Sequence, residues 1–393
     1  MKVLFIKSST TTHGGGSKAF MQMLSGLISL GVTPIVVLPD KKGLYTTLQS
    51  MGITCISLRY RMSVYPWSRS LKDKLMFIPR LIGRILVNNF ATLQLIRITK
   101  QFKPNLIHSN VSVTAIGYYA ARLLKIPHVW HIREYGDLDF NMHYYPTTQI
   151  QRNRYKKNLS YTICITKDIQ RHHQLKEWTN STVIYDGVLS TNDKTYIEHK
   201  KSYFLFAGRL EKAKGILPLI DAYAQYNKQH SHPLPLYVAG SGDLEYTQLI
   251  KEKLQHFGLE KDIKLLGMRD DILSLYKDAK ALIVPSISEG FGFITAEAMF
   301  CGCLVIGNDT AGTKEQFDNG SNMTGEEIAL RYTKQEELVQ HLMDVTDNPT
   351  KYYEPMILRG QHVAMKLYSA ESHAKQVYNF FHMISLLSTK NGR

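Results

Sequence analysis

With 393 residues, of which 44% are hydrophobic and 21% charged, the chain is too long for one ordinary core and has the composition of a soluble globular protein. It shows neither a secretory leader pattern nor an apolar run of the ~20 residues that cross a bilayer, which argues against an integral membrane protein and predicts a cytoplasmic one. The formal net charge of +15 calls for an anionic partner: nucleic acid, an anionic membrane surface or a phosphorylated small molecule.

Short apolar runs alternate with helical patterns through the first half of the chain. They predict strands at residues 3–6, 34–39, 105–109, 128–132, 161–166 and 182–187. Strand, helix and strand at this spacing are typical of a parallel sheet built from βαβ units. A polar, lysine-rich stretch at 189–202 then has the composition of a linker. We therefore place a first doubly wound α/β domain at residues 1–188.

The same alternation restarts after this stretch and predicts a second domain at residues 189–369. Its strands are expected at residues 203–208, 234–240, 263–267, 280–286 and 303–307. Active sites of doubly wound sheets lie at the carboxyl ends of the strands, so we expect two sheets that face each other across a cleft. The C-terminal helix, about 370–393, has an apolar stripe that suits packing on either domain, including a return to the first.

The stretch from residue 59 to residue 103 is strongly basic. It contains ten lysines and arginines against one acid, Asp73, and interleaves them with large apolar side chains. This composition is typical of a helix that lies on an anionic bilayer. A solvated helical face beside a core face is an equally good interpretation.

Two cationic residues follow the first strand of the second domain. In the string AGRLEKAKG (207–215), Gly208 lets the chain turn, and Arg209 and Lys214 project beyond the strand's carboxyl end. Arginine offers a planar fork to phosphate oxygens, and lysine offers a compact charge. The pair therefore predicts a phosphate site, with a solvent-exposed loop as the alternative.

A glycine-containing loop follows the strand at 280–286. Gly290 and Gly292 permit a close backbone approach, and a helix expected from about Ile294 directs the positive end of its dipole at the loop. Glu289 and Glu297 flank this phosphate cradle. Carboxylates at such a place need hydroxyl donors, and sugar and ribose hydroxyls would supply them.

These elements, together with the AGT at 311–313, resemble the C-terminal half of the retaining glycosyltransferase family 4, which has the GT-B fold of two Rossmann-like domains. The similarity covers roughly residues 183–330, and its bacterial surface-polysaccharide members are the type expected. The family implies retention of the anomeric configuration and no obligatory metal. It also implies that a phosphate oxygen of the donor takes the acceptor's proton.

The resemblance assigns roles residue by residue. Arg209 and Lys214 would bind the donor diphosphate, Glu289 would face the transferred sugar, and Glu297 would bind the ribose hydroxyls. The residues of the glycine loop would complete the donor site: Gly290, Phe291, Gly292 and Phe293.

The first domain resembles the family in layout. Gly15 and Gly16 follow the first strand and open a helix, as in the family's glycine loop near the donor phosphate and the acceptor. His131 ends a strand and matches a histidine placed by the reacting face of the sugar, with a histidine satisfied in the core as the alternative. Arg133 and Glu134 are the candidates for reading the acceptor.

We therefore expect a retaining hexosyltransferase that moves a sugar from a nucleotide diphosphate, with a UDP-sugar expected first, onto a hydroxyl of a glycan or lipid-linked acceptor. No cofactor or metal is expected. The Asp137–Asp139 D-x-D pattern lies outside the fold that uses it, and we expect this segment to be a loop. The expected location is the inner face of the membrane, peripherally bound, with no nucleic-acid partner. The alternatives are a sugar-nucleotide epimerase of the same fold and a non-enzymatic protein that binds membranes or nucleic acid.

Overall fold

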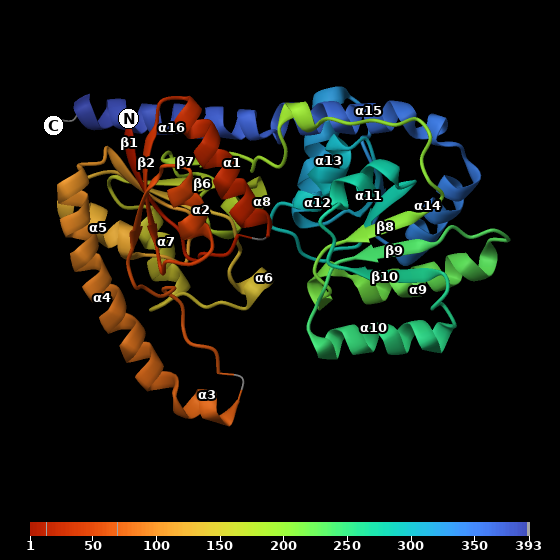
Figure 1. Cartoon of the computed structure of the whole chain (residues 1–393), viewed down its shortest axis with the longest axis horizontal. Helices are drawn as coiled ribbons and strands as arrows, with labels where there is room; N and C mark the ends of the chain where they lie inside the picture. Colours follow the sequence, from red (N-terminus) through yellow and green to blue (C-terminus); the bar gives the residue numbers. More distant parts are fainter. Residues whose placement is uncertain (13, 69, 391–393) are drawn as a thin grey trace. The chain divides into compact units, whose positions relative to one another are not determined.

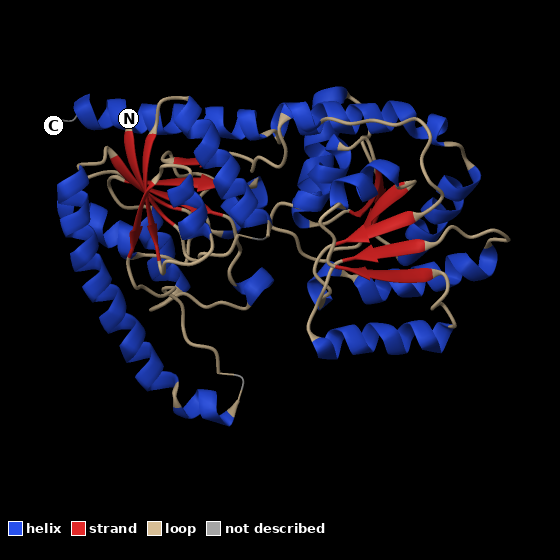
Figure 2. Ribbon diagram, in the orientation of Figure 1, coloured by secondary structure: helices blue, strands red, loops and turns tan. Residues whose placement is uncertain are grey.

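The computed structural model describes residues 1–12, 14–68 and 70–390, and the chain divides into two compact units. The first unit comprises Met1–Gly187 and the C-terminal segment from Ala370, and the second comprises Val188–Ser369. Each unit has one parallel sheet with helices on its faces (Figures 1 and 2). The predicted fold class, two Rossmann-like α/β domains, is confirmed.

The first unit has a seven-stranded sheet in the order β3-β2-β1-β4-β5-β6-β7, and every neighbouring pair is parallel. Its central strands are buried on both faces, which explains why they appear in the sequence as continuous apolar runs. The strands are β1 (Lys2–Ile6), β2 (Thr33–Leu38), β3 (Thr54–Ser57), β4 (Leu106–Ser109), β5 (His128–Ile132), β6 (Ser160–Cys164) and β7 (Ser181–Val183).

Nine helices of the described residues belong to this unit: α1 (Gly15–Ser29), α2 (Leu44–Ser50), α3 (Leu71–Leu75), α4 (Phe77–Phe102), α5 (Ile116–Leu124), α6 (Asp137–Phe140), α7 (Thr148–Tyr155), α8 (Lys167–His172) and α16 (Ala370–Lys390). The last helix packs on the first unit, with Val377 and Phe381 in the same buried cluster as Phe20 of α1. Gly26 allows this close packing, because a Cβ there would lie 2.4 Å from the Cβ of Ala374.

The second unit has a six-stranded parallel sheet in the order β10-β9-β8-β11-β12-β13. Its strands are β8 (Phe204–Ala207), β9 (Leu236–Ala239), β10 (Ile263–Gly267), β11 (Ala281–Val284), β12 (Leu304–Asn308) and β13 (Leu330–Tyr332). Its α-helices are α9 (Ile216–Gln229), α10 (Leu244–Phe257), α11 (Ile272–Asp278), α12 (Phe293–Phe300), α13 (Ala311–Thr324), α14 (Gln335–Asp347) and α15 (Thr350–Leu367).

The strand order of each sheet reverses once, and this reversal positions the candidate site. In the second sheet, the chain leaves β8 toward β9 on one side, while β11 is the neighbour of β8 on the other side. The loops after β8 and β11 therefore diverge at the carboxyl edge of the sheet, which is where ligands bind in open α/β sheets. The cationic loop follows β8, and the glycine-containing loop follows β11.

Three local expectations differ from the structure. Two strands at sheet edges, β3 and β13, were not predicted, because both are short and only partly buried. The Asp137–Asp139 segment, expected to be a loop, forms the helical turn α6, since Asp139 accepts the backbone N–H groups of Tyr135 and Gly136. The stretch 189–202 is packed rather than a free linker, because Tyr196 lies against Gly302 and its hydroxyl donates to Glu354 at 3.0 Å.

None of the helices described is both long enough and apolar enough to cross a membrane.

Candidate active site

The cationic loop after β8 folds directly against the end of β11. Gly215 closes the loop with φ of 71°, and a Cβ at this position would lie 2.0 Å from the carbonyl oxygen of Pro285. Only glycine permits this contact, both for its conformation and for its size. The backbone N–H of Ile287 also donates to the oxygen of Ala213 at 2.9 Å. The two loops of the predicted phosphate site therefore lie side by side.

Lys214 and Glu289 meet where these loops join. Lys214 Nζ lies 2.5 Å from Glu289 Oε1, and both side chains are mostly buried. The hydroxyl of Ser286 donates to the same carboxylate oxygen at 3.2 Å. Arg209 is more open: its side chain is 60% exposed and pairs with Glu211 at 3.0 Å. Lys214 is thus fixed beside the glycine loop, while the guanidinium of Arg209 extends into solvent.

Residues of α13 hold the backbone of the glycine loop by hydrogen bonds to its carbonyl groups. The N–H of Gly312 donates to Glu289 O at 2.9 Å, and Gln316 Nε2 donates to Phe291 O at 2.6 Å and to Gly292 O at 3.0 Å. A Cβ at Gly312 would lie within 2.9 Å of carbonyl oxygens at 289, 290 and 291, so α13 can approach this closely only with glycine. These contacts therefore fix the backbone conformation of the glycine loop.

Helix α12 begins at Phe293, one residue before the expected start, with Gly292 as its N-cap at φ of 91°. Backbone N–H groups in the first turn of a helix have no acceptor within the helix, and the helix dipole makes this end positive. Glu297 follows one turn later, is 9% exposed, and accepts the hydroxyl proton of Tyr276 at 3.2 Å. Lys214, Glu289 and the tip of α12 therefore lie along one edge of the second unit, and the lysine and the positive end of the helix make this edge chemically suited to an anion. We call it the anion-binding edge.

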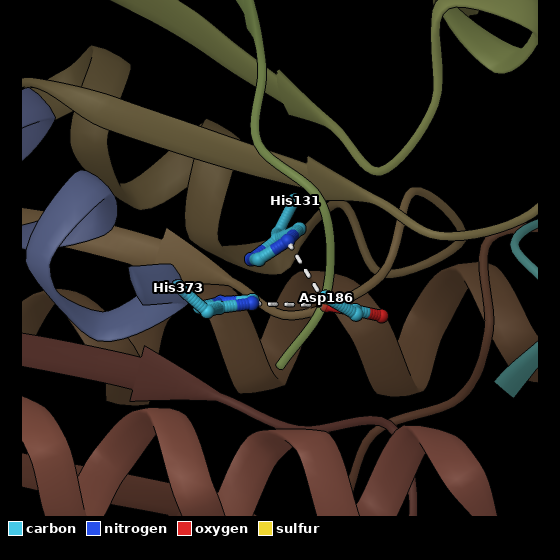
Figure 3. A group of neighbouring side chains, drawn as sticks. All are labelled: His131, Asp186 and His373. Atoms are coloured by element: carbon cyan, nitrogen blue, oxygen red, sulfur yellow. Dashed lines mark ion pairs between the residues drawn. The ribbon is translucent and has the colours of Figure 1, made fainter. Parts of the chain in front are cut away.

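In the first unit, His131 and Arg133 lie at the end of β5 (Figure 3 shows His131). His131 is fully buried, and its Nδ1 lies 3.2 Å from Nε2 of His108. Burial, and then the positive charge of Arg133, keeps the pKa of His131 well below its usual range, so the ring is neutral. Arg133 forms a short hydrogen bond to the buried carboxylate of Asp186.

His131, Asp186 and His373 each place one potential ligand atom within 4.8 Å of the others (Figure 3). This geometry alone would suit a metal ion, but the chemistry of the neighbours does not. The guanidinium of Arg133 already occupies Asp186 Oδ1, and a dication beside it would be repelled. His373 Nδ1 accepts the backbone N–H of Gly187 at 2.7 Å, so this lone pair is in use. The trio instead fastens α16 to the chain just beyond β7.

Glu134, a predicted acceptor-side residue, points into the first unit. It is 4% exposed and accepts both the N–H and the hydroxyl of Ser112, at 2.8 and 2.5 Å. Burial raises the pKa of Glu134 to about 7, although the bonds from Ser112 act in the opposite direction. Its position favours a role in holding the loop after β4 and thereby in supporting Arg133.

Gly15 and Gly16 form the first turn of α1, after Gly14 as N-cap with φ of 91°. A Cβ at Gly16 would meet no atom of the described residues within 4 Å, so none of these residues covers this side of the helix start. Lys7, which was not predicted from the sequence, lies near the start of α1. Its Nζ is 3.4 Å from the hydroxyl of Ser17. Burial, and then Arg133, lowers the pKa of Lys7 to about 8. A lysine directly after a predicted strand was the signal available in the sequence.

Comparison with known proteins finds similarity in the second unit. Residues 190–363 match the family model "Glycosyl transferases group 1". A D-inositol 3-phosphate glycosyltransferase of Corynebacterium jeikeium is 31% identical over 126 residues, which are 30% of this chain and 29% of that protein. The N-acetylgalactosamine-N,N'-diacetylbacillosaminyl-diphospho-undecaprenol 4-alpha-N-acetylgalactosaminyltransferase of Campylobacter jejuni is 32% identical over 121 residues, 30% of this chain and 31% of its own length. The chain thus spans less than half the length of the curated relatives it matches.

The fold as a whole has solved counterparts. The crystal structure of HepE from Anabaena, in complex with UDP and glucose, superposes with a TM-score of 0.75 at 19% identity and covers 97% of this chain and 99% of that one. At this identity the similarity establishes the fold alone, which is the GT-B fold with its two Rossmann-like domains.

Proposed function

We propose that this protein is a retaining glycosyltransferase that uses a nucleotide-diphosphate sugar, with a UDP-sugar as the first candidate donor. The carrying observation is the anion-binding edge at the switch point of the second sheet, where Lys214 and the tip of α12 meet beside Glu289. The match of residues 190–363 to glycosyl transferases group 1 supports the reaction type, and the HepE complex with UDP and glucose supports the donor class.

The reaction needs positive charge where a diphosphate leaves. The acceptor oxygen forms a bond to the anomeric carbon while the bond from that carbon to the donor phosphate breaks, and its electron pair moves to the phosphate oxygen. In the proposed mechanism that oxygen takes the acceptor's proton, on the same face of the sugar, so the configuration is retained. Lys214, Arg209 and the N–H groups at the start of α12 would stabilise the charge that develops.

Glu289 would receive the hydroxyls of the transferred sugar. Its carboxylate is already held by Lys214 and by Ser286, so it is oriented before any ligand arrives. Lys214 would then bind both the donor diphosphate and Glu289. Since the lysine would occupy less of the carboxylate, Glu289 could also accept hydrogen bonds from sugar hydroxyls. Glu297, one turn into α12, is the proposed ribose contact. In the first unit, the start of α1 at Gly15–Gly16 is the proposed donor contact, and Arg133 is the proposed acceptor contact. His131 is fully buried, and its proposed role is to position Arg133, whose Nη2 lies 3.5 Å from Nδ1 of the histidine.

We also propose an acceptor at an anionic membrane, on the basis of the exposed face of α3 and α4. Its large apolar side chains recur every three or four residues, which places them on one face of these successive helices. All seven are between 51% and 76% exposed; they form what we call the apolar stripe: Leu71, Leu75, Ile78, Ile82, Leu86, Phe90 and Leu93. An exposed apolar surface of this extent marks an interaction site.

The positive charge of the segment that carries the apolar stripe favours an anionic membrane as the partner. Asp73 is the only acid between residues 59 and 103, and Arg80 already neutralises it at 2.6 Å. The other described lysines and arginines of this stretch lie on the same two helices as the stripe or in the chain that adjoins them, whereas Arg69 lies outside the described residues. Basic side chains beside a row of apolar ones match the headgroups and the acyl boundary of an anionic bilayer. We therefore propose a peripheral position on such a membrane and a lipid-linked or polysaccharide acceptor.

Donor turnover and nucleotide binding test the reaction. We expect Glu289→Ala to abolish transfer while part of the affinity for UDP remains, because Lys214 and the helix tip stay in place. Glu260→Ala, an exposed acid of the same unit, is the matched control and should leave both unchanged. Near-normal transfer by Glu289→Ala would refute the assignment. Conversion of the nucleotide sugar into an epimer would support the epimerase reading, and binding of an oligonucleotide without any nucleotide sugar would support the non-enzymatic one.

A further inference from the structure

The side of α4 that faces α5 borders an apolar hollow of about 350 Å³, which lies within the usual ~300–1,000 Å³ of small-molecule sites. Its wall is mostly hydrocarbon, contributed by two helices that pack against each other and by the loop before α3. The main apolar contributors are Leu81, Ile85 and Leu93 from α4, and Ile116, Tyr119 and Leu123 from α5.

A second hollow, of about 360 Å³, lies on a neighbouring side of α4 and is lined by four arginines, with only Gly83 and Val87 beside them. Beyond β3 the chain alternates, so Leu58 and Tyr60 are buried while Arg59 and Arg61 point outward. Arg80 and Arg84 face them from α4, one turn apart.

This group of four arginines has little compensating negative charge. Arg80 pairs with Asp73, but no carboxylate of the described part of the chain pairs with Arg59, Arg61 or Arg84. Burial, together with the charges of Arg61 and Arg80, lowers the pKa of Arg84. Guanidinium groups gathered in this way are suited to phosphate oxygens, which they can bind with two parallel hydrogen bonds.

Two shared residues connect these features into one surface. Arg84 lines both hollows, and its Nη1 donates to Val64 O at 2.8 Å, which fixes the guanidinium at their boundary. At the other side, Leu93 belongs both to the apolar hollow and to the apolar stripe. Around α4 the order is therefore apolar stripe, apolar hollow and arginine hollow.

We propose that these two hollows form a binding site for a single-chain lipid that carries a phosphate or diphosphate head, such as a polyprenyl diphosphate. The four arginines hold the head, and the chain passes through the apolar hollow toward the apolar stripe and the bilayer. The site is distinct from the anion-binding edge, which belongs to the second unit. That this lipid is the carrier of the acceptor rests on the proposed function, whereas lipid binding itself does not.

Titration calorimetry of the full chain with farnesyl diphosphate, without vesicles, tests the site. We expect saturable binding, at least tenfold weaker binding of inorganic diphosphate, which lacks the chain, and at least tenfold weaker binding of farnesol, which lacks the head. Equal affinity for inorganic diphosphate would overturn the lipid site in favour of a plain phosphate site.

Substitutions of exposed residues separate the two halves of the site without disturbing the core. Arg59→Gln with Arg61→Gln should weaken farnesyl diphosphate binding at least tenfold. The matched pair, Arg97→Gln with Lys100→Gln, removes the same charge from α4 outside both hollows and should leave binding unchanged; equal losses would overturn the proposal. Asn89→Trp, which fills the apolar hollow, should weaken farnesyl diphosphate but not inorganic diphosphate.

The outcome is separable from that of the proposed function. UDP binding and transfer by the unmodified protein are measured in parallel, because none of the proposed donor contacts lies in either hollow. Farnesyl diphosphate binding with no reaction of any nucleotide sugar would refute the glycosyltransferase and leave the lipid site standing. Nucleotide-sugar turnover without farnesyl diphosphate binding would refute the lipid site alone.

Discussion

The apolar stripe on α3 and α4 gives a prediction whose size can be worked out from exposure. Leu86 and Phe90 are each 63% exposed. Full burial of a leucine or phenylalanine side chain contributes ~1.5–3 kcal/mol, so moving the exposed two thirds into a bilayer boundary contributes about 1–2 kcal/mol for each. Changing both to serine should therefore cost at least ~2 kcal/mol of membrane affinity, which is about thirtyfold in the partition coefficient.

The assay is co-sedimentation with vesicles that contain anionic lipid, over a range of lipid concentrations. Leu244 and Met268, which are 91% and 73% exposed in the second unit, provide the matched control: serine at both positions removes comparable apolar surface away from the stripe. Because the basic residues add an electrostatic part, binding of the unmodified protein should also weaken in higher salt and with neutral vesicles. Leu86→Ser with Phe90→Ser that sediments like the unmodified protein would refute the membrane interpretation, and association with a soluble protein would then explain the stripe.

Three further predictions concern the donor site and stability. Lys214→Ala should reduce the rate of transfer about 10²–10³-fold by removing a donor to the leaving phosphate, while Lys212→Ala, an exposed neighbour, should not; equal rates for the two variants would contradict the role. Ala311 is held at φ of 46°, so Ala311→Gly should raise the free energy of unfolding by ~0.5–1 kcal/mol and the calorimetric Tm with it; a lower Tm would show that its methyl group matters more than the strain. Burial lowers the pKa of His173 from 6.5 to about 4, so between these values the unfolded chain binds a proton that the folded chain does not, and stability falls as the pH falls. His173→Gln should remove roughly 2 kcal/mol of the stability loss between pH 6.5 and 5, measured by urea unfolding; an unchanged slope would contradict it.

The grouping of Lys214 and Glu289 at the anion-binding edge could be predicted from the sequence, because all of the sequence signals for it are local. Arg209 and Lys214 follow a strand directly, and Glu289 follows the strand that turns out to be its neighbour. The rule that ligands bind at the carboxyl ends of parallel strands then brings the two loops together. Gln316 was not predicted although it holds the glycine loop, because nothing in its own neighbourhood indicates that its amide reaches back 25 residues to Phe291.

The contacts around Asp186 in the first unit could not be predicted in this way. Arg133 meets Asp186 across 53 residues, and Gly187 donates to His373 across 186 residues. No spacing in the sequence relates these residues. The first contact depends on the positions of β5 and β7 in the sheet, and the second depends on the return of α16 to the first unit. Lys7 and Glu134 are similar: both are ionisable residues in strand-end positions, where exposure is a reasonable expectation, and both are buried by elements from elsewhere in the chain.

The basic stretch shows what the structure adds when a pattern has two meanings. In the sequence, apolar and basic residues alternating over 59–103 predict either a helix with one face in the core or a helix on a membrane. A core face would require the apolar side chains to be buried, yet in α4 the buried residues are Ala91, Thr92, Leu95 and Thr99, all in its C-terminal part. Among the larger side chains before them, those of the apolar stripe, such as Ile82 and Leu86, remain more than half exposed. Burial of apolar surface is the main force that positions a helix in a domain, and the described part of the chain does not cover this face of α4. The face is therefore available to a partner outside the domain.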